Sequence, residues 1–482
     1  MIREKYMIEA ESSDDRRYTL WDTFDWKIAR KGYLLFQDKD KFMLSRNKEP
    51  LFLERLDPVP ETICPETFKG SGLSQQIALC VSNRAVLPLR SVEEKNHYYK
   101  VLNEDSKIIL HLDVEEYHTK GSPAVRYFRL RALRGYNDET REFGRYLNSI
   151  GCSEDEGTYQ EKVVGEPLDQ LYSSKMNLKL DVTDESQTAA RKALRYKLSM
   201  AAINVDGCIQ DIDIEFLHDF RVYIRRLRSF VSQVRGIFPE ETVVEMKQDF
   251  SAVSGKTGQT RDLDVYLGDR EAFLDMVPDE LKQGLVSFFQ LLAVSRDSEF
   301  VKLKTYLEGD EFNGIMSKWM KFLESAETFK EENSTRPIRE TANIFIMKKL
   351  KKISKRIQAL HTHTDDILMH ELRIECKKLR YLLEAFISLY RDKRVNGLIK
   401  KLKKFQDYLG LLNDLTVQKE TLLSCLNKLG NVDDAIMIAS SVGALIVKLD
   451  ERHHELKEHF VKALKDFEKS ESQKTYRELF GG

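Results

Sequence analysis

Long apolar runs are absent from this sequence of 482 residues. No segment approaches the roughly 20 consecutive apolar residues that cross a bilayer, and the N-terminal stretch MIREKYMIEAESSDD lacks the apolar core of a secretory signal peptide. Cysteine is scarce and scattered, with no Cys-x-x-Cys pair among Cys64, Cys80, Cys152, Cys208, Cys376 and Cys425. This usage gives no zinc signature and is typical of a reducing compartment. We therefore expect a cytoplasmic protein with no membrane partner and no metal.

Net charge is nearly absent as well. The chain carries 77 Lys and Arg against 78 Asp and Glu, which leaves a formal charge of −1. A balanced total argues neither for nor against a polyanionic partner, so only the arrangement of the charges can decide. The 41% hydrophobic content is enough for real cores, and a chain of this length is expected to hold two or three domains.

The sequence pattern changes along the chain. Residues 1–150 contain short runs rich in Val, Ile, Tyr and Phe between polar turns, which predicts a β-rich domain with an antiparallel sheet and helices near 72–81 and 137–149. Residues 151–184 are acidic and rich in Gly and Ser, as in a linker. Residues 185–475 follow a helical period, so the predicted class is an α+β domain followed by an all-α domain.

The predicted helices lie near 185–208, 214–237, 240–255, 261–275, 278–308, 311–328, 337–362, 366–391, 394–411, 414–429 and 433–468. The phrase Asn333-Ser-Thr-Arg-Pro337 divides this region into halves of about 185–330 and 337–475. Two packed helical bundles are the simplest architecture for such a pattern.

One pattern occurs twice, 152 residues apart. HDFRVYIRRLR begins at His218 and recurs as HELRIECKKLR from His370. The spacing holds further on, where Gly258 matches Gly410 and Asp262 matches Asp414. A match over about 48 positions without a gap indicates an internal duplication.

Each copy places a histidine and three cations on one helical face, at positions 0, +3, +7 and +10. The first rail is His218, Arg221, Arg225 and Arg228, and the second rail is His370, Arg373, Lys377 and Arg380. Apolar residues occupy the opposite face of each helix, as in an amphipathic helix. Like charges at this spacing repel each other by a few tenths of a kcal/mol, so the pattern indicates an anion that offsets the repulsion.

A solvated charged face is the alternative interpretation, and it is common on ordinary helices. Two observations favour an anion site. Asp219 is the only acidic residue between 218 and 239, and a duplication allows the two rails to face each other across a pseudo-twofold axis. The second rail has Glu371, Glu375 and Glu384 as neighbours, so its case is weaker when it is taken alone.

Four phrases in order resemble the CHAD family, the "conserved histidine α-helical domain". They begin at Asp213, Thr257, His370 and Leu402, and the resemblance covers about 185–470. It implies two repeated four-helix units and a basic channel that binds inorganic polyphosphate. Both rails are carried over as binding residues. Further candidates are Arg226, Arg261, Lys378, Lys401 and Lys404.

The lysine run at 400–404 has two interpretations. It either extends the basic surface of the channel or is a solvated helix face, and the sequence does not separate these. Asp262 and Asp414 are expected to cap or pair with the rails rather than to contact an anion.

The N-terminal region resembles the CYTH, or triphosphate tunnel metalloenzyme, fold through Thr19–Trp26, Arg84–Leu89, Lys100–Lys107 and Leu133–Tyr136. The resemblance implies a barrel-like antiparallel sheet whose active members hold a divalent metal with converging glutamates. This chain departs from the pattern. It opens MIREKY without the Glu-x-Glu-x-Lys spacing, and residues 125–131 are basic where acid is expected. Asp113, Glu115 and Glu116 are the only clustered acids nearby, and we expect them to be exposed. We therefore predict a degenerate domain with no catalytic residues, metal or cofactor.

Three functions remain open. The leading hypothesis is a non-catalytic polyphosphate-binding protein, with association with polyphosphate granules as an extension. The alternative is a metal-dependent inorganic triphosphatase or polyphosphatase that uses the N-terminal tunnel. Nucleic-acid binding is disfavoured, because no row of aromatic residues is interleaved with the cations, as single-strand binders usually need. The oligomeric state is not predicted.

Overall fold

The computed structural model of the chain describes residues 6–64, 67, 70–119, 124–153, 157–362, 365–427, 434–468 and 471–481. The chain divides into two compact units, Met1–Lys175 and Met176–Gly482. None of the helices built from the described residues combines the length and apolarity needed to cross a bilayer.

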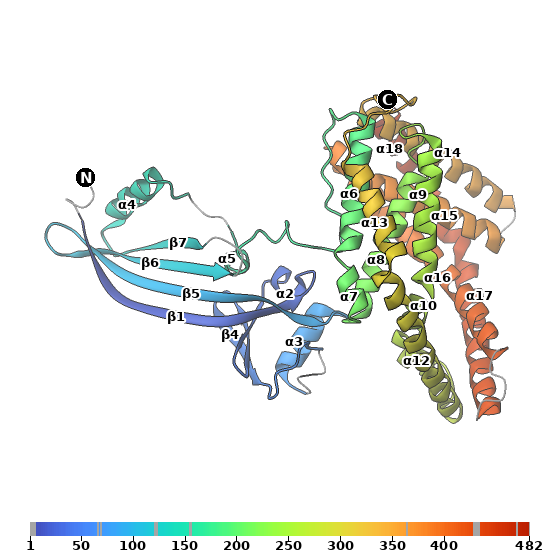
Figure 1. Cartoon of the computed structure of the whole chain (residues 1–482), viewed down its shortest axis with the longest axis horizontal. Helices are drawn as coiled ribbons and strands as arrows, with labels where there is room; N and C mark the ends of the chain where they lie inside the picture. Colours follow the sequence, from blue (N-terminus) through green and yellow to red (C-terminus); the bar gives the residue numbers. More distant parts are fainter. Residues whose placement is uncertain are drawn as a thin grey trace. The chain divides into compact units, whose positions relative to one another are not determined.

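The first unit is built on one antiparallel sheet. Its strands are β1 (Met7–Thr23), β2 (Leu34–Asp38), β3 (Lys41–Arg46), β4 (Glu49–Arg55), β5 (Val86–Leu102), β6 (Ile108–Thr119) and β7 (Val125–Ala132). The strand order is β4-β3-β2-β1-β5-β6-β7, with β1 and β5 as two long, curved central strands (Figure 1). This confirms the predicted antiparallel sheet, within which β4 and β7 are the edge strands.

Among the described residues, four helices accompany the sheet: α2 (Lys27–Arg30), α3 (Gly72–Val81), α4 (Asn137–Ser149) and α5 (Tyr159–Val164). The bounds of α3 and α4 agree with the predicted ranges 72–81 and 137–149. Helix α5 lies in the segment predicted as a linker, yet Val163 and Val164 are fully buried in a cluster with Leu20 and Val92 of the sheet. Part of that segment therefore belongs to the core of the first unit.

The second unit is helical. Its first half contains α6 (Ser186–Ala202), α7 (Val205–Ile209), α8 (Ile214–Val231), α9 (Glu240–Lys256), α10 (Gly258–Gly268), α11 (Arg270–Leu274), α12 (Asp279–Glu308) and α13 (Asp310–Glu324). Its second half contains α14 (Ile338–Thr362), α15 (Asp366–Phe386), α16 (Arg394–Leu426), α17 (Ala435–Glu468) and α18 (Glu471–Phe480). The offset of 152 residues pairs α6 with α14, α8 with α15, α9–α10 with α16, and α12 with α17, which confirms two repeated four-helix units.

Two hydrogen bonds show how the halves are related. The Ser186 amide donates to the Arg336 carbonyl over 2.9 Å, and the Ile338 amide donates to the Asp184 carbonyl over 3.0 Å. Ser186 and Ile338, the two donors, are equivalent positions of the repeat, and so are Asp184 and Arg336, the two acceptors. The two halves are therefore related by a pseudo-twofold axis that passes close to this point.

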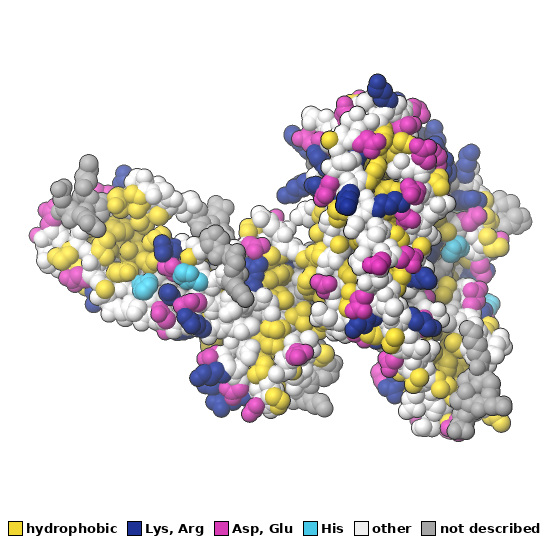
Figure 2. All heavy atoms as spheres, in the orientation of Figure 1, with side chains coloured by type: hydrophobic (Ala, Val, Ile, Leu, Met, Phe, Trp, Pro, Cys, Tyr) yellow, Lys and Arg dark blue, Asp and Glu magenta, His cyan; other side chains and the backbone are white. Residues whose placement is uncertain are grey.

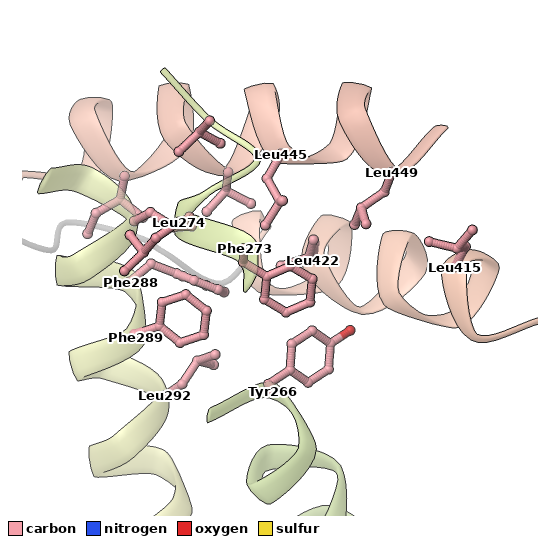
Figure 3. Close-up of a cluster of buried hydrophobic side chains, with 14 residues drawn as sticks. Tyr266, Phe273, Leu274, Phe288, Phe289, Leu292, Leu415, Leu422, Leu445 and Leu449 are labelled. Atoms are coloured by element: carbon pink, nitrogen blue, oxygen red, sulfur yellow. The ribbon is translucent and has the colours of Figure 1, made fainter. Parts of the chain in front are cut away.

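The halves also share a hydrophobic core. Residues of α10, α11 and α12 interdigitate with residues of α16 and α17, as Figure 3 shows for Tyr266, Phe273, Phe289, Leu422 and Leu445. Because this cluster draws on both repeats, burial of its apolar surface holds the two halves together as one folded unit.

Candidate anion-binding site

The rails lie on α8 and α15, and the same cap starts both helices. The Asp213 carboxylate accepts hydrogen bonds from the amides of Glu215 (2.9 Å) and Phe216 (3.2 Å). Asp365, one repeat later, accepts from the Ile367 amide over 2.9 Å. An aspartate at this position satisfies amides that have no partner inside the helix. Equivalent caps therefore start both rails in the same register.

The predicted apolar faces are buried. Phe216, Phe220, Ile224, Leu227 and Val231 of α8 have at most 2% of their surface exposed. On α15 the residues Leu372, Cys376, Leu379 and Leu383 are fully buried, while Leu368 is half-buried. Burial of one face fixes the rotation of each helix about its axis, so the opposite face carries the cations outward.

A groove of about 610 Å³ lies between α8, α9 and α15. Its cationic lining residues are Arg225, Arg228, Lys247, Arg373, Lys377 and Lys378, and none of its thirteen lining residues is acidic. On the face of the helical unit drawn in Figure 2, basic and acidic side chains are interspersed. The groove therefore concentrates positive charge that the balanced composition hides.

The two rails meet at Lys377. Burial, reinforced by Arg225, Arg373 and Arg380, lowers the pKa of the Lys377 ammonium to about 7, while Asp414 opposes the shift. Arg225 belongs to the first repeat and the other two arginines to the second. Cations from both rails therefore act on the same ammonium group, and a bound anion would relieve their mutual repulsion.

Other rail residues are held by neighbouring helices. Arg221 donates to the Ser254 carbonyl and to the Thr257 hydroxyl, both over 2.9 Å. Burial lowers the pKa of Arg221, and the charge of Asp262 opposes that shift. Arg373, its equivalent, lies 3.5 Å from the Asp414 carboxylate. In both repeats the aspartate is thus the counter-charge of a rail arginine, as the sequence suggested.

The histidines lie outside the lining of this groove. Nδ1 of His370 is 2.6 Å from Oδ1 of Asn413 on α16, and the imidazole is exposed. His218 is half-buried, and one of its nitrogens lies within 4.8 Å of carboxylate oxygens of Glu215 and Asp219. Both histidines precede the groove-lining residues of their own helices by about one to two turns and are not part of the groove lining.

Arg380 does not line the groove, in contrast to Arg373 and Lys377 of the same rail. Its Nε lies 3.6 Å from the Glu384 carboxylate, and Nη2 of Arg226 lies 3.5 Å from the same group. Neither arginine lines the groove. Glu384 is thus a partly buried carboxylate shared between one arginine of each repeat.

The remaining candidates are dispersed. Lys378 lines the groove and contacts Glu375 at 3.3 Å, whereas Arg261 donates to the Ile214 carbonyl at 3.3 Å. Lys401 and Lys404 are exposed on α16 and are not part of the groove lining.

Sequence reasoning missed the wall of the groove on α9. Lys247, Gln248 and Ser251 line it, and the Ser251 hydroxyl accepts a hydrogen bond from Arg228 over 3.2 Å. The repeat gives no signal for Lys247, because the equivalent residue is Ile399. Only the packing of α9 against α8 brings this lysine to the site.

Two of the three acids clustered on β6 are buried and Glu116 is partly buried, so the expectation that the cluster is exposed was wrong. Asp113 has 6% and Glu115 8% of their surface exposed. Arg131 donates to Asp113 over 2.8 Å, and Lys48 donates to Glu115. Ion pairing across the sheet offsets the cost of burying these charges. Among the described residues, the one group of His and acidic ligands compact enough for a metal ion is Glu215, His218 and Asp219, in the helical unit.

A family model and one solved structure agree with the helical architecture of the second unit. A family model described as the CHAD domain matches residues 192–423. The crystal structure of the CHAD domain from the plant Ricinus communis is similar at 23% identity and a TM-score of 0.50, covering 60% of this chain and 95% of that one. PptA from Streptomyces chartreusis gives 13% identity and a TM-score of 0.48, covering 58% of this chain and 100% of that one. No curated protein matches the chain.

Proposed function

We propose that this chain, whose residues 192–423 form a CHAD domain, binds inorganic polyphosphate in the groove between α8 and α15. One observation carries the proposal. Six cations from α8, α9 and α15 line a single groove that contains no carboxylate. Such a surface is costly to keep empty, because like charges repel each other across it.

Polyphosphate has the chemistry that this groove requires. It is a flexible chain with a negative charge on each phosphate, so it can bind along a line of cations. It carries no nucleobases, so the protein needs no base-specific contacts. Arginine can bind two phosphate oxygens at once, while lysine acts as a mobile point charge. Tyr381 is the only aromatic residue in the lining. A single-stranded nucleic acid would need more stacking partners than this groove offers.

The contacts of the first unit support a binding role without catalysis. The buried carboxylates of β6 already have Lys48, Arg129 and Arg131 as partners. A divalent ion held by these carboxylates would have to displace those side chains before it could activate a triphosphate. We extend the proposal to recruitment to polyphosphate granules, which would follow from binding alone.

The test is binding of the full-length protein to long-chain polyphosphate at near-physiological salt, with an RNA of matched charge as competitor. Binding that RNA does not displace is the expected result. Binding that RNA removes at equal charge would make the groove a general basic surface. The triphosphatase alternative is tested in parallel through release of phosphate from tripolyphosphate with magnesium present, and release above the blank would overturn the non-catalytic role.

A further inference from the structure

Helix α9 of the first repeat forms one wall of the groove. None of the described lining residues comes from α16, the equivalent helix of the second repeat. On α9, Gln248 and Ser251 face the site, and the contact between Ser251 and Arg228 fixes which side of the helix this is. One turn of helix separates these two residues, so they form a short stripe that points at the end of the first rail.

The internal repeat places two lysines at the equivalent positions. Moving Gln248 and Ser251 by 152 residues gives Lys400 and Lys403 of α16. Helix α16 packs on α15 as α9 packs on α8. The same position of each helix contacts the rail helix: the Ser254 carbonyl of α9 accepts from Arg221 of α8, and Gln406, the counterpart of Ser254, donates from its side chain to the Cys376 carbonyl of α15. The two lysines are therefore expected beside the second rail.

An independent contact gives the same orientation. Asp414 of α16 lies 3.5 Å from Arg373 of the second rail, so this side of α16 faces the rail. Lys403 precedes Asp414 by eleven residues, close to three helical turns, and lies on the same side. Relative to the midpoint of Lys400 and Lys403, Lys401 is rotated by about 130° and Lys404 by about 70°, away from the side that carries Asp414.

We propose that Lys400 and Lys403 form a second lobe of the groove, which continues the path of the phosphate chain past Arg225 and Lys377 along α15. This inference rests on the polyphosphate-binding function proposed above. The binding site is then longer than the groove lined by α8, α9 and α15. Of the lysines at 400–404, Lys400 and Lys403 bind the phosphate chain, whereas Lys401 and Lys404 do not.

The two lobes differ in charge, and the difference explains the position of Arg380. In the first lobe Arg228 donates to the Ser251 hydroxyl. In the second lobe the equivalent residues, Arg380 and Lys403, are both cations, so they cannot bond to each other and Arg380 turns to Glu384 instead. Lys400 and Lys403 are exposed, and no ion pair within the described part of the chain involves either of them. Asp407, one turn beyond Lys403, is the acidic neighbour on this side of the helix.

The experiment compares two double variants that remove the same charge from the same helix. Lys400→Ala with Lys403→Ala is set against Lys401→Ala with Lys404→Ala, and all four side chains are exposed, so neither pair should alter the fold. We expect the first pair to weaken polyphosphate binding by about tenfold and to lower the salt slope by about 1.4, for two lost contacts at ~0.7 each. The second pair should change affinity by less than about twofold.

Equal weakening by both pairs would overturn the second lobe and leave a general electrostatic effect. A larger effect of the second pair would place the bound phosphate chain on the other side of α16, which also contradicts the proposal. Absence of binding by the wild-type protein would instead refute the polyphosphate function itself, so the two failures are distinguishable. Circular dichroism confirms that both variants remain helical.

Discussion

The Tyr266 hydroxyl donates a hydrogen bond of 3.1 Å to the main-chain carbonyl of Gln418, and these residues occupy the same position in the two repeats. Equivalent residues can touch only close to the axis that relates them. The bridge between Glu185 and Pro337 marks a second such point, since these residues are also 152 apart. Two points define the pseudo-twofold axis, which brings α8 and α15 into contact and so creates the groove.

Replacement of Tyr266 by Phe should weaken the contact between the repeats. The hydroxyl is lost while the ring stays in the cluster of Figure 3, so we expect the free energy of unfolding to fall by about 1 kcal/mol. Polyphosphate affinity should not change, because Tyr266 does not line the groove. Urea denaturation and a binding titration measure the two quantities.

Tyr306→Phe is the matched control for this prediction. The Tyr306 hydroxyl is buried and has no hydrogen-bond partner among the described residues. Its removal should leave stability unchanged or raise it slightly, because an unsatisfied polar atom is removed from the interior. A loss equal to that of Tyr266→Phe would show that the hydrogen bond to Gln418 contributes nothing specific.

Arg225 and Lys377 should dominate binding, because they face each other from the two rails. Alanine at either position is expected to weaken polyphosphate binding by about tenfold, the usual worth of a charge-assisted contact. Lys302→Ala with Lys304→Ala on α12 removes exposed positive charge away from the groove and serves as the control. If the control pair costs as much affinity as Lys377→Ala, net charge rather than the groove governs binding.

Binding should strengthen as pH falls through neutrality. The pKa of Lys377 in the empty groove is about 7, lowered first by burial and then by the neighbouring arginines. A phosphate chain favours the charged ammonium and raises this pKa, so binding takes up a proton. We expect affinity to fall by about tenfold between pH 6 and pH 8, the range over which free Lys377 loses its proton.

Calorimetry in buffers of different ionisation enthalpy measures this proton uptake directly. Lys377→Arg keeps the charge at every pH in this range and should remove most of the pH dependence. Long chains are needed, since terminal phosphates titrate near neutrality while internal ones do not. An unaltered pH profile in the arginine variant would show that another group is responsible.

The helical unit was largely readable from the sequence, because each helix carries a local signal. Asp213 and Asp365 cap the two rail helices, and apolar residues at helical spacing fix their buried faces. Several predicted boundaries were wrong, and the ranges 185–208 and 261–275 each contain two helices, α6 with α7 and α10 with α11. Helices expected at 394–411 and 414–429 are one continuous helix, α16, which runs through Gly410, and α18 was not predicted. Where Thr257 separates α9 from α10, the equivalent residue Leu409 lies within α16.

Strand β1 could not be read from the sequence, although it is central to its sheet. Most of residues 7–17 are exposed on both faces, so MIEAESSDDRR lacks the alternation that marks a half-buried strand. Its pairing with β5 over nearly its whole length is what holds it. At the site, the rails were predicted, but Lys247 and the withdrawal of Arg380 to Glu384 were not, because both depend on contacts between helices.

Lys197 should destabilise the fold below neutral pH. This lysine of α6 is fully buried, and burial, with help from Arg226, lowers its pKa to about 7, against the opposing charge of Glu384. In the unfolded state, the pKa of Lys197 has its usual value of 10.5. The unfolded state therefore binds more protons between these values, and stability rises with pH across that range.

Lys197→Met tests this sign. The variant should be more stable than the wild type at pH 6, and its advantage should shrink by pH 9, in urea denaturation at both values. Lys349, the equivalent residue, has Glu375 as a partner at 2.7 Å, so Lys349→Met should lower stability by leaving that carboxylate underpaired. A constant advantage of Lys197→Met at both pH values would mean that its ammonium does not titrate in this range.

Replacement of Glu384 by Ser should separate binding from stability. Glu384 pairs with Arg380 and Arg226, whereas the equivalent residue of the first repeat is Ser232, next to an Arg228 that faces the groove. Serine would release Arg380 toward the phosphate chain, so we expect severalfold tighter binding and a steeper salt dependence.

The same substitution should lower stability. Arg226 would lose its carboxylate partner while its Nε and Nη1 remain buried, and the free energy of unfolding should fall by about 1–3 kcal/mol. Saturating polyphosphate should recover part of this loss, because a ligand that binds only the folded state stabilises it. Weaker binding by a variant that is still folded would instead show that Glu384 holds Arg380 in its binding position.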